Sequence, residues 1–571
     1  MIDLAPSKTA VPRDSPGGFR HLTLVTLLLA ELLFLSRGFL HLLVVPMWEG
    51  FDEPFHYAYV QYIAENSRLP PLNAPAVSQE ILESLQLFPT TYHLSYLTPM
   101  RFKNFWELGA ADRVRLRQSL DSIEPAAKNQ LANLPNYQTQ HPPLYYLLCV
   151  PVYLGARDLS LVDRVFLLRS FSLLLAAVSL PLGYVLARRI LGNNWAVFVP
   201  VLMSLFPNYY VFIGRVTNDA LAVVIFPLLI LATKNLHDKP LTAGQPLSLG
   251  LLLGLGLLTK AYFLTVVPVL LITILLKRFQ RQVTLKKCGF AILLIVVPAA
   301  ILAGWWYGRN YLEVGTFFGL IHMKRTASVP LIAWLQGLSH IQLGQFAKGL
   351  FQFHLWAGNW SFRMASKTLY QLFGVAYVLC GIGIIRYYLK NRSIGDIEPD
   401  HDRERIHHAM LPFMFFLSFL AGLIHYRWSV TVAWILTYGQ FSGLFGSEGW
   451  YLNVLLPVEA MFLILGIRGL VGQRRSRVAC LILLSLFFIL DQVALWSREI
   501  PYYAGLSIRV AHPFANPVDA VKHVTVSLAL AFRRVAFLGP HWSSESLLLL
   551  LVILTLGITA VTLVLVHRRL S

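Results

Sequence analysis

The stretch on which the fold depends reads Trp48-Glu49-Gly50-Phe51-Asp52-Glu53-Pro54-Phe55-His56-Tyr57-Ala58-Tyr59. It directly follows the first long apolar run of the chain, residues 22–46. Asp52 has the chemistry of a helix N-cap, and Pro54 suits a first helical turn, where its missing N–H is not needed. We therefore predict a helix over residues 53–66 that begins where a membrane-spanning helix ends.

Within this predicted helix, residues four apart share a face, so Asp52 and His56 are expected to be neighbours. Its apolar stripe is expected to lie in the headgroup zone of a membrane; the stripe consists of Phe55, Tyr59, Tyr62 and Ile63. The adjacent carboxylates of Asp52 and Glu53 allow two interpretations. They mark either an ordinary helix start at a membrane surface, or a catalytic carboxylate held at the membrane–water boundary.

The composition places this stretch in a polytopic membrane protein. Of 571 residues, 56% are hydrophobic and only 13% are charged, about half the charged fraction of soluble domains. Residues 22–46 are long enough to cross roughly 30 Å of hydrocarbon, and no small-residue cleavage pattern follows them. The formal net charge of +19 would suggest a nucleic-acid partner in a soluble protein. Here the basic residues cluster at helix ends, as the positive-inside rule expects, so we predict no nucleic-acid partner.

Charge also predicts the sidedness of the loops. Residues 277–287 hold five basic residues and no acidic one, which is typical of a cytoplasmic loop, whereas residues 47–142 hold ten acidic and seven basic residues. Within that acidic segment, short helices are expected at 53–66, 78–87 and 110–120. The four cysteines lie far apart in apolar segments and indicate neither a disulfide framework nor a metal site.

We expect an all-α polytopic fold of about 12 transmembrane helices, with both termini in the cytoplasm. The predicted order is a cytoplasmic tail (1–21), the first transmembrane helix (22–46), a first external loop with juxtamembrane helices (47–162), transmembrane helices two to seven (163–307), an external loop with interfacial helices (308–367), transmembrane helices eight to eleven (368–496), a third external loop (497–544), and the last transmembrane helix with a cytoplasmic tail (545–571).

In this topology, a set of polar and aromatic residues emerges on one side of the membrane, at or near helix ends. The set consists of Asp52, Glu53, His56, Gln140, His141, Asn218, Asp219, Lys260, Arg309, Trp450 and Tyr451. Such a set suits a substrate that is half lipid and half polar: one carboxylate acts as general base, a second group positions it, and cations hold phosphate.

Each member of the set also has an ordinary structural explanation. His141 can simply start a helix with the two prolines that follow, and Asn218 with Asp219 can cap one. Lys260 can be a turn residue, Arg309 can reach up to lipid headgroups, and the aromatic residues can form an interfacial belt.

Several of these stretches together resemble the GT-C superfamily of integral-membrane glycosyltransferases, in particular relatives of protein O-mannosyltransferases and aminoarabinose transferases. The matching stretches are Asp52 to His56, Gln140-His141-Pro142-Pro143-Leu144-Tyr145-Tyr146, Arg215 to Asp219, Thr259-Lys260, Phe353 to Trp360 and Gly449-Trp450-Tyr451. The resemblance implies a many-helix fold whose first external loop forms juxtamembrane helices over a cavity.

It also implies a donor sugar linked to a polyprenyl phosphate or diphosphate. Asp52 would deprotonate an acceptor hydroxyl, which displaces the lipid phosphate with inversion at the sugar. Lys260 and Arg309 would hold the phosphate. Related enzymes carry a charged pair before the two prolines, where this chain has Gln140 and His141, and an imidazole binds phosphate as a cation only when protonated.

Members of the superfamily differ in their use of metal, so a divalent metal held by Asp52 and Glu53 stays open. The expected partners are a polyprenyl-phosphate-linked sugar, a hydroxyl acceptor and the lipid bilayer. The short tails and the absence of sorting signals favour a bacterial or archaeal plasma membrane, with the site on the external or periplasmic face.

The alternative function is a transporter or flippase of lipid-linked sugars. That function needs inverted repeats and polar breaks in mid-membrane, and the sequence has no clear internal repeat. Gly254 and Gly256 come nearest to a broken span. A receptor or scaffold, as a third possibility, would not require the polar set.

Overall fold

The computed structural model describes residues 16–72, 74–92, 99–319, 329–339, 342–393, 401–438, 447–506 and 517–570. These residues form a bundle of long helices, with one two-stranded hairpin, β1 (Ala357–Gly358) and β2 (Arg363–Met364). The predicted all-α polytopic class is confirmed. In the described part, ten helices are long and apolar enough to cross a membrane, or eleven if a pair bent by 63° counts as one span.

The long helices and the spans they form have the following bounds. They are α1 (Pro16–Val44), α7 (Leu161–Ala177) continued by α8 (Ser179–Leu191), the bent pair built from α9 (Asn193–Ala196), α10 (Phe198–Ser204) and α11 (Pro207–Ile213), α12 (Asp219–Asp238), α14 (Val266–Phe279), α15 (Leu285–Val314), α19 (Lys367–Ser393), α20 (His401–Tyr438), α21 (Leu456–Ala494), which is kinked at Gly472 and contributes to two spans, and α24 (Glu545–Leu570).

One helix within the region predicted to hold transmembrane helices two to seven is shorter than a full span. It is α13 (Gly244–Leu257), a helix of 14 residues. At 1.5 Å per residue it measures about 21 Å, too short to cross the hydrocarbon region alone. Gly254 does not break this helix. A Cβ at Gly254 would lie 2.8 Å from the Leu302 side chain, so the glycine allows α13 to press against α15.

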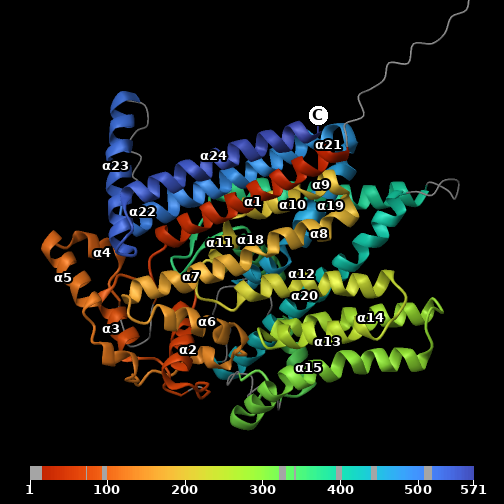
Figure 1. Ribbon diagram of the computed structural model, residues 1–571, viewed down its shortest axis with the longest axis horizontal. Helices are drawn as coiled ribbons and strands as arrows, with labels where there is room; N and C mark the ends of the chain where they lie inside the picture. Colours follow the sequence, from red (N-terminus) through yellow and green to blue (C-terminus); the bar gives the residue numbers. More distant parts are fainter. Residues whose placement is uncertain are drawn as a thin grey trace, which may run out of the picture.

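The first loop folds into short helices at one end of the bundle (Figure 1). They are α2 (Glu53–Asn66), α3 (Gln79–Leu87), α4 (Phe102–Glu107), α5 (Ala110–Asp121), the 3₁₀ helices η1 (Pro125–Lys128) and η2 (Tyr137–Gln140), and α6 (Leu144–Gly155). The three helices predicted at 53–66, 78–87 and 110–120 are therefore confirmed, each to within one residue at either end.

The environment of α2 is not the predicted one. The side chains of residues 53–63 are all buried, so the apolar stripe packs inside protein rather than in the headgroup zone. Asp52 does precede the helix, but its backbone is left-handed (φ 58°) and its side chain makes no capping hydrogen bond. Asp52 therefore holds the predicted N-cap position without capping the helix, and its carboxylate instead accepts a hydrogen bond from Tyr137.

Later loops are also helical. Residues 308–367 include α17 (Leu331–Ser339) and α18 (Leu343–Leu355), and the segment after α21 forms the π-helix η5 (Leu495–Glu499), α22 (Ile500–Tyr503) and α23 (Pro517–Leu538). The C-terminal end of α24 and the α14–α15 turn lie at the end of the bundle opposite α2 to α6 (Figure 1). This arrangement agrees with the predicted sidedness, which itself stays a prediction.

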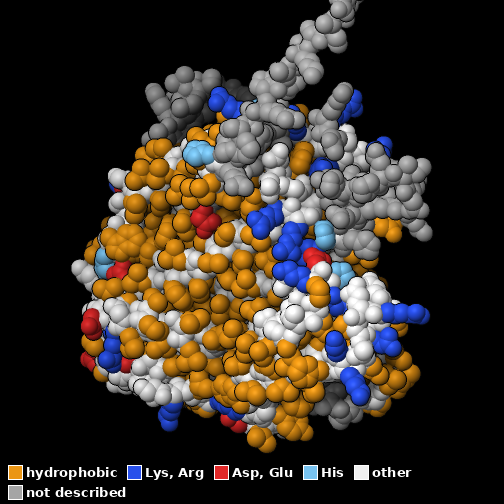
Figure 2. All heavy atoms as spheres, turned by 45° about the vertical axis from the view of Figure 1, so that its right-hand side comes forward, with side chains coloured by type: hydrophobic (Ala, Val, Ile, Leu, Met, Phe, Trp, Pro, Cys, Tyr) orange, Lys and Arg blue, Asp and Glu red, His pale blue; other side chains and the backbone are white. Residues whose placement is uncertain are grey.

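The outer surface of the bundle suits lipid. Hydrophobic side chains cover most of the face drawn in Figure 2. On α15, Phe290 is 57% exposed, Leu293 58% and Ile301 73%. A continuous apolar surface of this kind is costly in water and favourable in a bilayer, so the helices are placed with these faces toward the membrane.

Candidate active site

Asp52 is partly exposed, whereas every other residue between positions 40 and 63 is buried. Its Oδ1 accepts a hydrogen bond from the hydroxyl of Tyr137, at 2.6 Å. Burial raises the pKa of the Asp52 carboxyl above its usual range. The hydrogen bond from Tyr137 and the charges of Arg215 and Lys260 act in the opposite direction. A carboxylate held in this way is reachable and more basic than an ordinary one, as a general base requires.

The adjacent Glu53 is fully enclosed and has no free acceptor. Arg169 of α7 donates from Nε to Oε1 at 2.7 Å and from Nη2 to Oε2 at 2.6 Å. The backbone N–H groups of Val216 and Trp48 donate to the same two oxygens, at 3.1 and 3.2 Å. Because its lone pairs are used in this way, Glu53 joins the chain around residue 48 to two other segments.

A metal held jointly by the two carboxylates does not fit this geometry. Glu53 would have to give up its ion pair with Arg169 inside the protein, which is strongly unfavourable. Nor do the described residues contain a group of three or more His, Cys, Asp or Glu side chains arranged to hold a metal ion.

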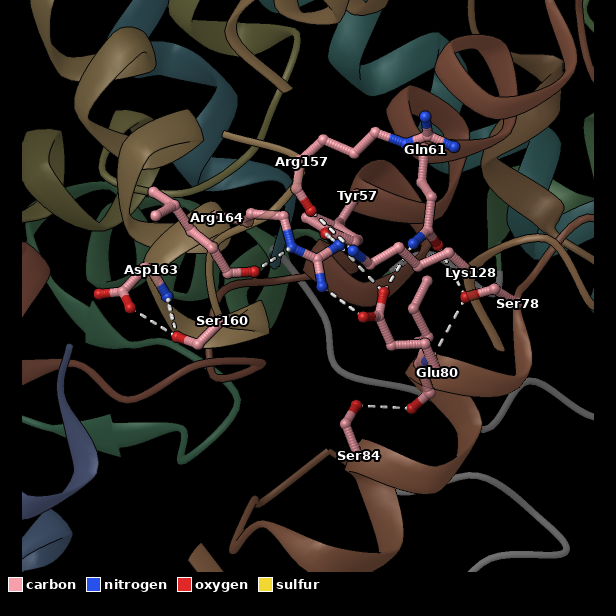
Figure 3. A network of polar contacts seen from close by, with 12 residues as sticks. Tyr57, Gln61, Ser78, Glu80, Ser84, Lys128, Arg157, Ser160, Asp163 and Arg164 are labelled. Atoms are coloured by element: carbon pink, nitrogen blue, oxygen red, sulfur yellow. Dashed lines mark hydrogen bonds and ion pairs between the residues drawn. The ribbon is translucent and has the colours of Figure 1, made fainter. Parts of the chain in front are cut away.

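A second arginine of α7 fixes the first loop in the same way (Figure 3). Arg164 forms a buried ion pair with Glu80 of α3 and donates to the hydroxyl of Tyr57, at 2.8 Å. Gln61 donates to Glu80 at 2.7 Å and so links α2 to the same network. With Arg169 five residues further along, α7 therefore holds both the start of α2 and the α2–α3 contact in place.

Beside Asp52, the segments 215–219 and 259–262 bring two cations to one carboxylate. Asp219 accepts from Lys260 Nζ at 2.6 Å, from Thr217 Oγ1 at 3.1 Å and from the Tyr262 hydroxyl at 3.2 Å. Arg215 Nη2 donates to the same group at 3.4 Å. Asn218 ties the two segments together by donating to the backbone carbonyl of Thr259, at 3.0 Å.

Arg215 has unused hydrogen-bonding capacity. Its side chain is only 4% exposed, yet the buried Nε and Nη1 make no hydrogen bond within the described structure. Its guanidinium lies over the ring of Phe51, 5.3 Å from the centroid. A planar guanidinium with free donors matches a phosphate group, and these donors lie next to the segment that carries Asp52.

The two histidines of the set lie together but do not supply positive charge. The rings of His56 and His141 stack, with centroids 5.9 Å apart, and His56 Nδ1 bonds the Tyr146 hydroxyl at 2.7 Å. Burial, with the nearby charge of Lys260, lowers the pKa of His141 to about 3. Burial also lowers the pKa of His56 well below its usual range. Both shifts favour the neutral imidazole, whereas a cationic phosphate ligand needs the protonated form.

Trp450 and Tyr451 come from the 3₁₀ helix η4 (Ser447–Leu455). Trp450 packs on Phe51 with ring centroids 4.6 Å apart, and Lys260 Nζ lies 4.8 Å from the centre of the Tyr451 ring. Gly449 allows this placement, because a Cβ there would lie 2.1 Å from the carbonyl oxygen of Leu350 in α18.

Two predicted site residues have other surroundings. Arg309 donates to Glu313 and to the backbone carbonyl of Pro70, both at 2.8 Å. In the described part of the chain, no hydrogen bond or ion pair joins it to Asp52 or Asp219. Gln140 is partly exposed, and its backbone carbonyl accepts a hydrogen bond from Trp306, at 3.4 Å.

Three residues of the site were not predicted from the sequence: Arg169, Arg215 and Tyr137. An arginine inside an otherwise apolar helix, such as Arg169 within α7, is a signal that could have been used, because such residues are nearly always paired or functional. Tyr137 carries no such signal.

Residues 153–307 match the family model described as dolichyl-phosphate-mannose-protein mannosyltransferase. The match covers about a quarter of the chain. The matched part contains Arg169, Arg215, Asp219 and Lys260, and it does not reach Asp52.

Solved structures also resemble the chain. ArnT from Cupriavidus metallidurans, bound to undecaprenyl phosphate, is 12% identical over 97% of this chain and 78% of its own, with a TM-score of 0.42. The archaeal oligosaccharyltransferase AglB from Archaeoglobus fulgidus, in complex with an inhibitory peptide and a dolichol-phosphate, is 11% identical over 92% of this chain and 60% of its own, with a TM-score of 0.40. At TM-scores below 0.5, neither likeness indicates which residues act. No curated protein matches the sequence.

Proposed function

We propose that this protein is a GT-C glycosyltransferase, which transfers a sugar from a polyprenyl-phosphate-linked donor to an acceptor hydroxyl, with inversion, on the external face of the membrane. The observation that carries the proposal is that the buried Arg215 lies over the ring of Phe51, the residue directly before the partly exposed Asp52, and that its Nε and Nη1 have no partner within the described structure. One group can take a proton and the other can hold a phosphate, as displacement of a lipid phosphate requires.

In the proposed reaction, Asp52 removes the proton of the acceptor hydroxyl as its oxygen attacks the anomeric carbon. The bond between that carbon and the phosphate oxygen breaks, and the lipid phosphate leaves with the electron pair. Arg215 and Lys260 stabilise the negative charge that develops on this leaving group. Attack from the face opposite to the phosphate inverts the anomeric centre.

The remaining residues would position these groups. Glu53, held by Arg169, fixes the turn that presents Asp52, so we assign it a positioning role rather than the catalytic one suggested by its sequence neighbour. Asp219 orients Lys260 and Arg215 toward each other. His56 and His141 act as neutral packing and hydrogen-bonding groups, and no step of the reaction passes through a metal.

The test is the isosteric variant Asp52→Asn, purified in detergent beside the control Asp112→Asn, which changes a solvent-facing aspartate paired with Arg115 on α5. Both are incubated with a radiolabelled polyprenyl-phosphate hexose and a membrane extract that supplies hydroxyl acceptors. Loss of a general base costs about 10²–10⁴-fold in rate, so Asp52→Asn should nearly abolish product while the control keeps it. Equal rates for both would refute the role of Asp52.

The same experiment addresses the transporter alternative. Reconstituted in vesicles, a flippase would move the labelled lipid across the bilayer and form no new glycosidic bond. Product formation by the wild-type protein, lost in Asp52→Asn, supports the transferase.

A further inference from the structure

Glu448 is a buried carboxylate beside the site that the proposed reaction leaves unused. It lies in η4 and is 5% exposed. Arg427 of α20 donates from Nη1 to its Oε1, at 3.2 Å. Its second oxygen, Oε2, is buried and accepts no hydrogen bond within the described structure. A buried acceptor without a donor is unfavourable, so each such group calls for an explanation.

The position of Glu448 relates it to Asp52. Two residues further along η4, Trp450 packs on Phe51, the residue directly before Asp52. Glu448 therefore belongs to the helix whose Trp450 packs against the residue next to Asp52.

The positively charged side chains near Asp52 and the carboxylate of Glu448 come from different segments. Lys260 and Arg215 both donate to Asp219, whereas Glu448 and Trp450 come from η4. A sugar linked to a phosphate has a matching division, because its phosphate is anionic while its ring offers hydroxyl donors and apolar C–H faces. Aromatic rings suit those apolar faces, and a carboxylate oxygen suits the hydroxyl donors.

We propose that Glu448 and Trp450 form the subsite for the donor's sugar, in which the ring packs on the Trp450 indole and a sugar hydroxyl or ammonium donates to Glu448 Oε2. The inference rests on the proposed function and adds the class of sugar. With Glu448 and Asp52 both nearby, the subsite favours a neutral or amino sugar and disfavours a uronic acid, whose carboxylate would be repelled.

The informative variant is Glu448→Gln, because the adjacent Arg427 determines how the new amide group is oriented. Arg427 is a donor only, so it selects the amide oxygen of the glutamine, and the amide NH₂ then points where Oε2 was. A hydrogen-bond acceptor is thus replaced by a donor with little change in shape. The matched control is Glu545→Gln, which alters an exposed glutamate of α24 paired with Arg533, at 2.7 Å.

The experiment measures displacement of radiolabelled polyprenyl phosphate from detergent-purified protein by three competitors: unlabelled polyprenyl phosphate, its hexose derivative and its hexuronate derivative. We expect wild-type protein and Glu545→Gln to prefer the hexose derivative over the bare phosphate and over the hexuronate. In Glu448→Gln the preference over the bare phosphate should fall by roughly tenfold to a hundredfold. The preference over the hexuronate should shrink, while affinity for the bare phosphate stays unchanged and reports a folded phosphate site.

The outcomes separate this inference from the proposed function. If wild-type protein does not bind polyprenyl phosphate, the proposed function fails. If it binds the phosphate without preferring the hexose, or if Glu448→Gln keeps the full preference, the sugar subsite is wrong and the proposed function stands. Should Glu448→Gln lose all binding, Glu448→Asp replaces it, because the shorter carboxylate is expected to keep the preference against the hexuronate while losing part of that for the hexose.

Discussion

Replacing Arg215 by methionine tests the proposed phosphate site most directly. The change removes the two unpartnered donors, Nε and Nη1, and keeps most of the side-chain volume packed on Phe51. The carboxylate of Asp219 stays paired, because it still accepts hydrogen bonds from Lys260 and Tyr262. We therefore expect a folded protein that binds phosphate poorly.

The size of the effect follows from the two lost donors. A hydrogen bond to a charged group contributes about 1.5–3 kcal/mol, so two such bonds contribute at most about 3–6 kcal/mol. Since about 1.4 kcal/mol corresponds to a factor of ten, the affinity for polyprenyl phosphate should fall by roughly 10²–10⁴-fold. Arg215→Lys keeps the charge but not the planar pair of donors, so it should recover only part of this loss.

The assay is equilibrium binding of radiolabelled polyprenyl phosphate to wild-type protein, Arg215→Met and Arg215→Lys in the same detergent, with melting temperatures recorded for each. Arg309→Met is the matched control, because it removes an arginine that bonds Glu313 and Pro70 rather than Asp219. Wild-type affinity in Arg215→Met, at an unchanged melting temperature, would refute the phosphate role. A large loss in Arg309→Met alone would support the phosphate role predicted for Arg309.

Three further predictions concern the same segment of the chain. Arg169→Met leaves Glu53 buried without its partner and should destabilise the fold by about 3–5 kcal/mol, seen as a large fall in melting temperature. Tyr137→Phe removes the hydrogen bond that lowers the pKa of Asp52, so the acid limb of the rate profile should move to higher pH. Burial raises the pKa of Glu49 from 4.5 to about 7, so its contribution to stability should decrease, by at most about 3 kcal/mol, as pH rises through that interval.

The sign for Glu49 follows from linkage. Its pKa is higher in the folded protein than in the unfolded chain, so the folded state holds the proton more tightly and loses stability as the carboxyl ionises. The difference in melting temperature between wild-type protein and Glu49→Gln at pH 5 and pH 8 isolates this group, and an equal difference at both pH values would contradict the assignment. An unmoved acid limb in Tyr137→Phe, or unchanged melting of Arg169→Met, would contradict the other two.

The helices of the first loop illustrate how far local sequence predicts this fold. Pro54 at a helix start, followed by a suitable run to Asn66, is a local signal, and the predicted bounds of α2 agree with the structure. Whether its aromatic face meets lipid or protein is not a local property. That face is buried because distant segments pack on it, as Asn136 does by donating to the carbonyl of Phe55 from 81 residues away, at 2.9 Å.

The site itself shows the same division. Polar residues at helix ends on one side of the bundle were recognisable in the sequence, and Asp52, Asp219 and Lys260 do lie in one region. The sequence could not distinguish the roles of two adjacent carboxylates, nor indicate that Arg309 bonds Glu313 and the carbonyl of Pro70. Those differences depend on partners such as Arg169, which is 116 residues away from Glu53.

By itself, the sequence determined that this chain lies in a membrane, where its helices run and which short stretches carry polar chemistry, because apolar length, charge at helix ends and four-residue spacing are local properties. Only the tertiary structure decided that Glu53 is enclosed while Asp52 is partly exposed, and that two donors of Arg215 have no partner among the described residues. The physical reason is that the burial of a side chain and its hydrogen-bond partners depend on contacts between segments far apart in the sequence. A local sequence pattern does not specify those contacts.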